Sequence, residues 1–433
     1  MPETPRQVAT VSSMEANVVR RRPFGTNPEV GERGTDTRRR VLAAALEVFG
    51  ETAFAEASVE QIADRAGCSR PAFYQYFSSK EDVFWTLARG LGNRMVELAR
   101  QLGPIGPDAE GVEQLTAWVD SFMQLHGDWA PVFAAFPSAS RGERQQVARS
   151  EQITDATGRA LLKAFGVRRT RASERLVTNL VAVLIRCSFY AEAAPTGMSR
   201  QPLVVGLARL IHRVLAGPID GVNLRRGRPA RRRRIEIVVP SEPDLRPELR
   251  ARGERTRRKL LDAGVAVLPE RGYHDTRVDD LVEAAGVSHG TFYRYFDSKD
   301  DFFRVLAGEA SARMIEQIDR LQLDAPPDEL RAWLRDWFDA YEADGGIIST
   351  WQDMRTSPEL AAFSMEVAAS VFTRLEQLLD RRDFGHPQVS ATLLLALIER
   401  APYHVYTLGF GTRDEVIEST ITIIRRGFLA LDD

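Results

Sequence analysis

The chain has 433 residues, of which 44% are hydrophobic and 27% are charged, so it can form a packed core in two or three domains and is not globally disordered. The formal net charge of −2 neither favours nor excludes a nucleic-acid partner. Two cysteines are too few for a disulfide framework, and the lack of a signal-like or membrane-length apolar run predicts a cytoplasmic protein without membrane association.

The first segment with helical periodicity follows an irregular N-terminus. Residues 1–34 are rich in Pro, Gly, Thr and charge, which predicts a disordered arm. From Thr37 to Glu51 the apolar residues fall at helical spacing, which predicts an amphipathic helix.

Two short helices are predicted next. Ser58 is placed to cap a helix over Val59–Ala66, with Gln61 three residues later completing a capping box. Gly67 supplies the turn, and Ser69 caps a second helix with Pro71 in its first turn. A helix, a short turn and a second short helix form a helix-turn-helix pattern.

The outward face of the second short helix suits a DNA major groove. Phe73 and Phe77 lie four residues apart and are expected to face the core, so Arg70, Tyr74 and Gln75 point away from it. Arg pairs with guanine, Gln with adenine, and a Tyr hydroxyl reaches phosphate. Lys80 opens the next helix and is expected to hold a phosphate.

A helical domain is predicted to follow. A connecting helix covers residues 80–102, and two long apolar helices cover 173–190 and 202–215. Between them, aromatic residues recur at helical spacing, which fits either a core stripe or the wall of an apolar cavity. The cavity candidates here are Trp118, Phe122, Trp129 and Phe133.

An Arg-rich linker is predicted over residues 217–253. Arg226-Gly-Arg-Pro is similar to an AT-hook, whose Arg side chains enter a narrow minor groove, so Arg226 and Arg228 are candidate DNA contacts. A tether with solvated charge fits the same composition equally well.

The helix-turn-helix segment then occurs a second time. A shift of 219 residues (288 − 69) aligns Thr37–Phe84 with Thr256–Phe303 without a gap, and about 19 of 48 positions are identical. Pro269 is expected to kink or shorten the first helix of this copy. Arg277 replaces the Ser cap, so Thr276 is expected to cap one residue earlier.

The second half ends as the first does. A connecting helix is predicted over residues 299–323, and long apolar helices over 388–406 and 414–431. Arg186 and Glu399 stand at equivalent places, in Leu-Ile-Arg and Leu-Ile-Glu, which suggests two surfaces diverged to fit each other, although a solvated face would show the same pattern. The second set of cavity candidates is Trp333, Trp337, Tyr341 and Trp351.

These segments resemble the TetR family of bacterial transcription regulators. The resemblance rests on the Thr-Arg start, the Gly-x-Ser turn, Phe-Tyr-x-Tyr-Phe and Ser-Lys-Glu/Asp, in both copies. In the family, the helical domain holds an inducer and the last helices pair between subunits as a four-helix bundle. The resemblance implies DNA contacts from Thr37, Ser58, Ser69, Arg70, Pro71, Ala72, Tyr74, Gln75, Tyr76 and Lys80, and from Thr256, Ser288, His289, Gly290, Thr291, Tyr293, Arg294, Tyr295 and Lys299.

The predicted fold is all-α, with two tandem units that could pair within one chain as a pseudo-dimer, and with further association of whole chains left open. We divide the chain into an arm (1–34), a first reader (35–80), a first body (81–216), a linker (217–253), a second reader (254–299) and a second body (300–433). A reader is a DNA-binding helix-turn-helix domain, and a body is a helical regulatory domain.

The predicted function is a ligand-responsive, DNA-binding transcription regulator, most simply a repressor. Two unlike readers imply an imperfectly symmetric operator, and the predicted partners are double-stranded DNA and a small apolar effector. The six His lack metal-ligand spacing, and no phosphate loop or nucleophile elbow occurs, so we expect no enzyme, metal or cofactor. The alternative is an architectural DNA-binding protein that acts through the Arg-rich linker without an inducer.

Overall fold

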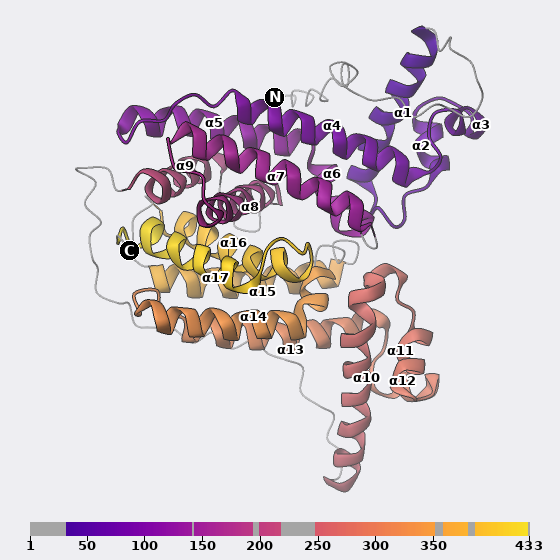
Figure 1. Cartoon of the computed structure of the whole chain (residues 1–433). Coiled ribbons are helices and arrows are strands. Elements are labelled where there is room, and N and C mark those ends of the chain that lie inside the picture. Colours follow the sequence, from indigo (N-terminus) through magenta and orange to yellow (C-terminus); the bar gives the residue numbers. More distant parts are fainter. Residues whose placement is uncertain are drawn as a thin grey trace, which may run out of the picture.

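The structure is a computed structural model that describes residues 32–140, 143–193, 199–217, 247–350, 358–379 and 386–431. Every regular element in these ranges is a helix (Figure 1). None of the described helices combines the length and the apolar character needed to cross a bilayer.

The first unit contains α1 to α9. Their bounds are α1 Glu32–Glu51, α2 Val59–Arg65, α3 Arg70–Tyr74, α4 Lys80–Arg100, α5 Ala109–Asp128, α6 Ala130–Ala139, α7 Arg144–Ala164, α8 Arg171–Ala193 and α9 Arg200–Ala216. The helix predicted from Thr37 begins earlier, at Glu32, and the short and long helices otherwise lie where the periodicity placed them.

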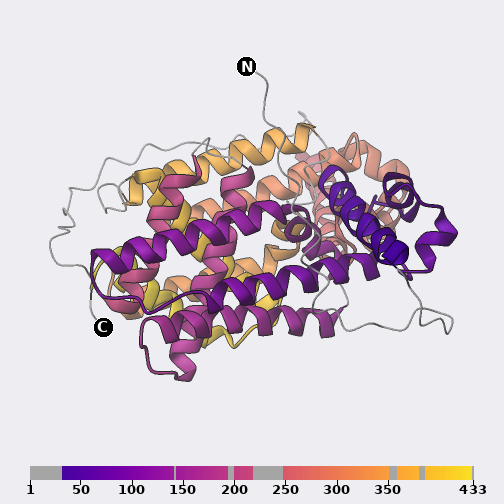
Figure 2. The same cartoon turned by 90° about the horizontal axis from the view of Figure 1, so that it is seen from above.

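The second unit repeats this order. Its elements are α10 Pro247–Asp275, α11 Val278–Ala285, α12 His289–Tyr295, α13 Lys299–Arg320, α14 Pro327–Thr350, α15 Pro358–Leu379, α16 Pro387–Tyr406, α17 Arg413–Thr422 and the π-helical turn η3 Ile423–Phe428. The two readers lie at the same end of the molecule, on opposite sides of the packed bodies (Figures 1 and 2).

The two bodies pack directly against each other. Helix α8 lies on α16 and α17, and α9 lies on α16 and η3. A Cβ atom at Gly206 of α9 would stand 2.3 Å from Val389 Cγ1, and one at Gly427 would stand 2.4 Å from Leu210 Cδ1. Glycine at these positions therefore allows a close approach of the helices, and the buried apolar residues of both bodies form one continuous core.

One ion pair crosses this interface between equivalent positions of the two units. The Nε atom of Arg186 in α8 lies 2.8 Å from Oε2 of Glu399 in α16. The hydroxyl of Tyr190 donates to the same carboxylate oxygen at 2.6 Å, and the Arg186 guanidinium lies 4.6 Å from the Tyr190 ring centre. The two residues whose equivalent positions suggested diverged surfaces are thus in direct contact, and the divergence itself stays a prediction.

The pair gives a stability prediction. Arg186→Glu should place two carboxylates together in a largely buried site and destabilise the protein by about 3–5 kcal/mol. Glu399→Arg should have a similar cost, and the double exchange should recover most of it because the pair is restored in reverse. Urea unfolding of the four proteins measures this cycle.

A pair on the outside of the second unit provides the control. Arg331 and Glu418 are more exposed, so breaking that pair should cost less than about 1 kcal/mol. A double exchange as unstable as the worse single variant would show that Arg186 and Glu399 do not act as a direct pair.

Candidate nucleic-acid interface and ligand cavity

The local signals of the first reader fold as predicted. The Ser58 hydroxyl accepts from the Gln61 backbone at 3.2 Å, and the Gln61 side chain accepts from the Ser58 backbone at 2.8 Å. Gly67 has φ of 62°, which favours glycine. Ser69 caps α3 by accepting from the Ala72 amide at 3.3 Å, with Pro71 in the first turn.

The predicted inward and outward faces of α3 are confirmed. Phe73 and Phe77 are 0% and 3% exposed. Tyr74 is 48% exposed, and its counterpart Tyr293 on α12 is 56% exposed. Among the described residues, the only other large hydrophobic side chain with comparable exposure is Met365. Each reader therefore presents an aromatic ring to solvent.

The remaining predicted DNA-contact residues lie on or beside these surfaces. Exposed positions are Ser69, Arg70, Pro71, Gln75, Ser288, His289, Gly290 and Arg294. Partly buried positions are Ala72, Tyr76, Thr291 and Tyr295. Ser58 caps α2, whereas Thr37 and Thr256 lie within α1 and α10. Arg226 and Arg228 lie outside the described residues. No bound DNA tests these contacts, and they stay predictions.

The start of α11 differs from its prediction. Thr276 does not cap the helix; its side chain is buried and donates to the Gly272 carbonyl at 2.7 Å. The cap position is Arg277, whose backbone amide donates to Asp280 Oδ2 at 2.8 Å. The helical path of α10 breaks at Gly272, three residues after Pro269, where φ is 76° and glycine is favoured. His289 at the start of α12 forms an ion pair with Asp279 of α11.

Lys80 has a structural role that the sequence reading missed. Its ammonium donates to the carbonyl oxygens of Phe54 (2.7 Å), Ala55 (3.0 Å) and Ala57 (2.9 Å). An ammonium has three N–H donors, so all are used within the protein. Lys299 likewise donates to the carbonyls of Tyr273 and Thr276. In this geometry the three N–H groups of Lys80 are all used within the protein, whereas Lys299 uses two, and DNA contacts of either lysine stay predictions.

The reason lies in the loop between α1 and α2. Its carbonyls have left the helical ladder and need donors, and Lys80 supplies them from the start of α4. Burial lowers the pKa of Lys80, and the same cause lowers the pKa of Lys299. Each connecting helix is thus fastened to its reader at its first residue.

A cavity of about 170 Å³ lies in the first body. Helices α4, α6, α7 and α8 and the end of α5 form most of its wall, and α16 of the second unit with the loop after it completes the wall. Phe133 lines the cavity, as predicted. The wall also includes Trp85, His126, Arg400 and Tyr403, which were not predicted.

The other aromatic candidates pack in the core and do not line this cavity. The indole N–H groups of Trp118, Trp333 and Trp337 donate to the carbonyls of Leu98, Gln317 and Ile398 at 2.9, 2.8 and 2.8 Å. Phe122 and Trp129 are buried, and Tyr341 stacks on Tyr406. Trp351 lies outside the described residues. The core alternative for these stripes therefore holds.

Two buried histidines stand at the cavity. His126 is 1% exposed, stacks on Phe133, and has no hydrogen-bond partner on either ring nitrogen. Burial, reinforced by the charge of Arg400, lowers the pKa of His126 to about 3. Burial and the charges of Arg400 and Arg175 also lower the pKa of His404 to about 3. Both rings are therefore neutral at ordinary pH.

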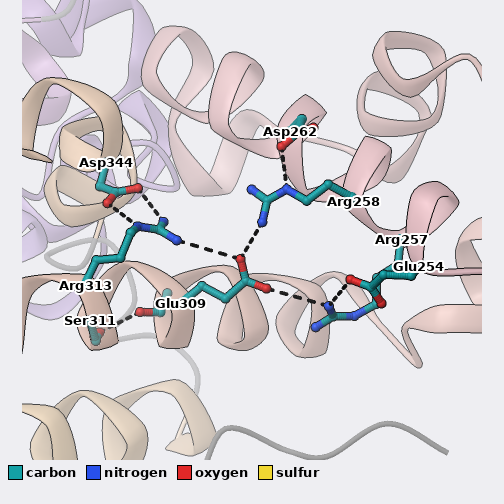
Figure 3. A network of polar contacts seen from close by, with 9 residues as sticks. Glu254, Arg257, Arg258, Asp262, Glu309, Ser311, Arg313 and Asp344 are labelled. Carbon is teal, nitrogen blue, oxygen red and sulfur yellow. Dashed lines mark hydrogen bonds and ion pairs between the residues drawn. The ribbon is translucent and has the colours of Figure 1, made fainter. Parts of the chain in front are cut away.

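An ionic network joins the second reader to its body (Figure 3). Glu309 of α13 lies 2.9 Å from Arg258 and 3.7 Å from Arg257, both of α10. Arg313 of α13 donates two hydrogen bonds, of 2.8 and 2.6 Å, to Asp344 of α14. At the position of Glu309 the first unit has Gly90 (309 − 219), so the carboxylate that joins α13 to α10 is not present at that position.

The apolar packing of the two readers differs in the same way. The core of the first reader is continuous with the core that surrounds the cavity, whereas the second reader belongs to a separate apolar cluster. The apolar core of the first reader thus continues into its body, and the second reader is joined to its body by the Glu309 ion pairs besides apolar contact.

Lys80 provides a prediction that separates folding from DNA contact. Lys80→Met should lower the free energy of unfolding by at least about 2 kcal/mol, because three carbonyls lose a charged donor. Arg70→Met is the matched control: Arg70 is exposed, and its loss should cost less than about 0.5 kcal/mol. Thermal unfolding without DNA measures both. A Lys80→Met protein as stable as the wild type would argue against the structural role.

The buried histidines predict a pH dependence of stability. In the unfolded chain His titrates near 6.5, whereas His126 and His404 bind a proton in the folded state only near pH 3. Their stabilisation is therefore present above pH 6.5 and is lost as pH falls, by about 1.4 kcal/mol per histidine between pH 7.5 and 5.5. His126→Gln should reduce the measured loss by about that amount in urea titrations at the two pH values. An unchanged loss would contradict it.

Comparison with known proteins assigns the two readers to one family. The model for "Bacterial regulatory proteins, tetR family" matches residues 41–85 and again residues 260–306. A solved transcriptional regulator (TerR/AcrR family) from Aquifex aeolicus aligns with 17% identity and a TM-score of 0.33, over 38% of this chain and 95% of that one.

Several curated relatives are transcription regulators. The HTH-type transcriptional activator FasR of Mycolicibacterium smegmatis is 29% identical over 39% of this chain and 79% of its own length. The HTH-type transcriptional repressor AcnR of Corynebacterium glutamicum is 30% identical over 24% of this chain and 58% of its own length. The fatty acid metabolism regulator protein of Bacillus subtilis is 38% identical over 14% of this chain and 31% of its own length. These relatives include an activator and a repressor. The chain carries the N-terminal segment of the tetR family of bacterial regulatory proteins twice in tandem, at residues 41–85 and 260–306.

Proposed function

We propose that this chain is a DNA-binding transcription regulator whose two readers act on one duplex from within a single polypeptide. The observation that carries the proposal is the exposed, polar and aromatic face of each reader helix, with Tyr74 on α3 and Tyr293 on α12. The two readers lie at the same end of the molecule (Figures 1 and 2), which supports contact of both with one duplex. Successive major grooves on one face of DNA are roughly 34–36 Å apart.

The contact between unlike bodies supports an intramolecular pseudo-dimer. A two-fold pairing of two first bodies through the same face would bring Arg186 against Arg186, and a pairing of two second bodies would bring Glu399 against Glu399. Like charges in a largely buried site are unfavourable, whereas the unlike units place Arg186 on Glu399 at 2.8 Å. A first body is therefore expected to pair with a second body and not with another first body. The linker joins the two bodies covalently within one chain.

The two readers present different chemistry to the duplex. Arg70 and Gln75 are exposed on the first reader, and His289 and Arg294 on the second. Arg favours guanine and Gln favours adenine in the major groove. The operator of this protein should therefore be imperfectly symmetric, with one half-site for each reader.

Helix α4 is the connection through which a ligand would act. It begins at Lys80, which is fastened to the first reader, and it continues along the cavity through Leu91 and Met95. A ligand that fits the cavity better in one position of α4 shifts the population towards that position and moves the reader with it. We propose release of DNA on ligand binding, which is repression relieved by an effector.

The alternative, an architectural protein that acts through the linker, depends on Arg226 and Arg228, which lie outside the described residues. Deletion of residues 225–234 separates the two hypotheses. Site-specific binding that survives the deletion supports the regulator, and complete loss of DNA binding supports the architectural protein.

The proposed function is tested with a random duplex library and the full chain. Selected DNA should show two unlike half-sites, one chain per duplex, and a footprint that spans both. Tyr74→Ala or Tyr293→Ala should weaken binding by about 1–3 kcal/mol, and Arg294→Ala should also relax base preference in one half-site. Gel shifts and selection with each variant measure this.

Met365→Ala is the matched control, because Met365 is a similarly exposed large side chain that belongs to α15 and not to a reader helix. It should bind DNA as the wild type does. Absence of duplex binding at low salt by a folded wild-type chain would overturn the proposed function.

A further inference from the structure

We propose that the cavity of the first body takes an amphiphile with an apolar body and a single anionic head, and that Arg400 of the second unit receives the head. This inference rests on the proposed ligand response and names the chemical class of the ligand. The sequence predicted a small apolar effector, and the proposal adds an anionic head to that description.

Arg400 is a charge without a counter-ion. Its Nε atom is buried and has no hydrogen-bond partner, and no described carboxylate lies within ion-pair distance of its guanidinium. Its contact is with the ring of Tyr403, 4.5 Å from the guanidinium carbon. The adjacent Glu399 is already bonded to Arg186 and Tyr190. The three charges of Arg186, Glu399 and Arg400 therefore sum to one uncompensated positive charge.

Other buried groups at the same wall also lack hydrogen-bond partners. The indole N–H of Trp85 is buried without a partner in a side chain only 7% exposed, and both ring nitrogens of His126 are unpartnered at 1% exposure. A buried donor without an acceptor costs about 1–3 kcal/mol, and an unpaired charge costs more. A bound group that supplies negative charge and acceptor oxygens would relieve these costs, and the cavity beside the set gives that group room.

The rest of the wall specifies the other end of the ligand. Leu91, Met95, Val132, Ile153 and Ile185 surround the cavity with apolar surface. The hydroxyls of Ser150 and Thr154 are bonded to carbonyls of their own helix, so they do not provide a second polar anchor, and the other two arginines of the wall, Arg89 and Arg149, are exposed. An apolar chain therefore fits this part, and the charged head belongs at the Arg400 end.

The site is shared between the two units. Arg400, Tyr403 and His404 come from α16, whereas the apolar wall comes from the first body. A head group on Arg400 and a chain between α4 and α7 would thus contact both units at once. The affinity for the ligand therefore depends on how the two bodies pack against each other, as well as on the position of α4.

The test uses the full chain and four probes of equal chain length at sub-micellar concentration: decanoate, decyl phosphate, decanol and decylamine. Isothermal titration should show at least one of the two anions binding about 10- to 100-fold more tightly than decanol, as expected for a charged hydrogen bond in a buried site. Which anion is preferred identifies the head as carboxylate or phosphate. Equal binding of all four probes, binding of decylamine alone, or no binding would overturn the proposal.

Arginine variants locate the head group. Arg400→Met should lower anion affinity to the level of decanol without lowering the thermal midpoint of the free protein, because an uncompensated charge is removed. Arg149→Met is the matched control: Arg149 also borders the cavity but is exposed and bonded to Gln146. It should leave anion binding unchanged, and loss of binding in Arg149→Met but not in Arg400→Met would overturn the assignment.

The two proposals fail separately. DNA binding by the same preparations is measured with the selected duplex. A chain that binds DNA but prefers no anion contradicts only the ligand class, whereas a chain that binds the anion but no DNA contradicts only the proposed function.

Discussion

The packing of two unlike helical bodies is the constraint on which the rest of the structure depends. Helices α8 and α9 meet α16, α17 and η3 at close range, which Gly206 and Gly427 allow, and the apolar residues of both bodies form one core. Into this interface the chain places Arg186 against Glu399, at positions equivalent in the two units. Without this contact the cavity would lose one wall, and neither reader would have a fixed position relative to the other.

A second set of contacts connects that core to the readers. Lys80 and Lys299 each fasten a connecting helix to the loop carbonyls of the reader before it. In the first unit the same helix continues along the cavity, so one uninterrupted helix connects Met95 at the cavity wall to Lys80 at the reader. The three hydrogen bonds of the Lys80 ammonium are short-range and directional, so they make the junction between α4 and the first reader stiff. A flexible junction would uncouple the reader from the cavity.

Features set by neighbouring residues could be predicted from the sequence, and features set by distant ones could not. The Ser58 and Ser69 caps, the Gly67 turn and the inward face of Phe73 depend on residues within a few positions, and all are confirmed. The structural role of Lys80 could not be predicted, because its carbonyl partners lie 23 to 26 residues earlier. The aromatic stripes at Trp118 and Trp333 have the right spacing for either a core or a cavity wall, and only tertiary packing decides between them. The position of Arg400 at the cavity could not be predicted, because the rest of the wall is formed by residues far earlier in the chain. An arginine within the apolar segment of residues 388–406 does, however, indicate a candidate functional residue.

Duplication within one chain removes the requirement that both units do the same thing. In a symmetric dimer every substitution appears twice, so a charge that helps one subunit must be tolerated in the other. Here Glu309 ties the second reader to its body, whereas Gly90 stands at that position in the first unit, between Arg89 and Leu91 of the cavity wall. Under the proposed ligand response, the ion pairs of Glu309 would restrain the second reader, and the continuous apolar core would let the first body and reader adjust together. A pair of identical subunits could not divide these roles without breaking its own symmetry.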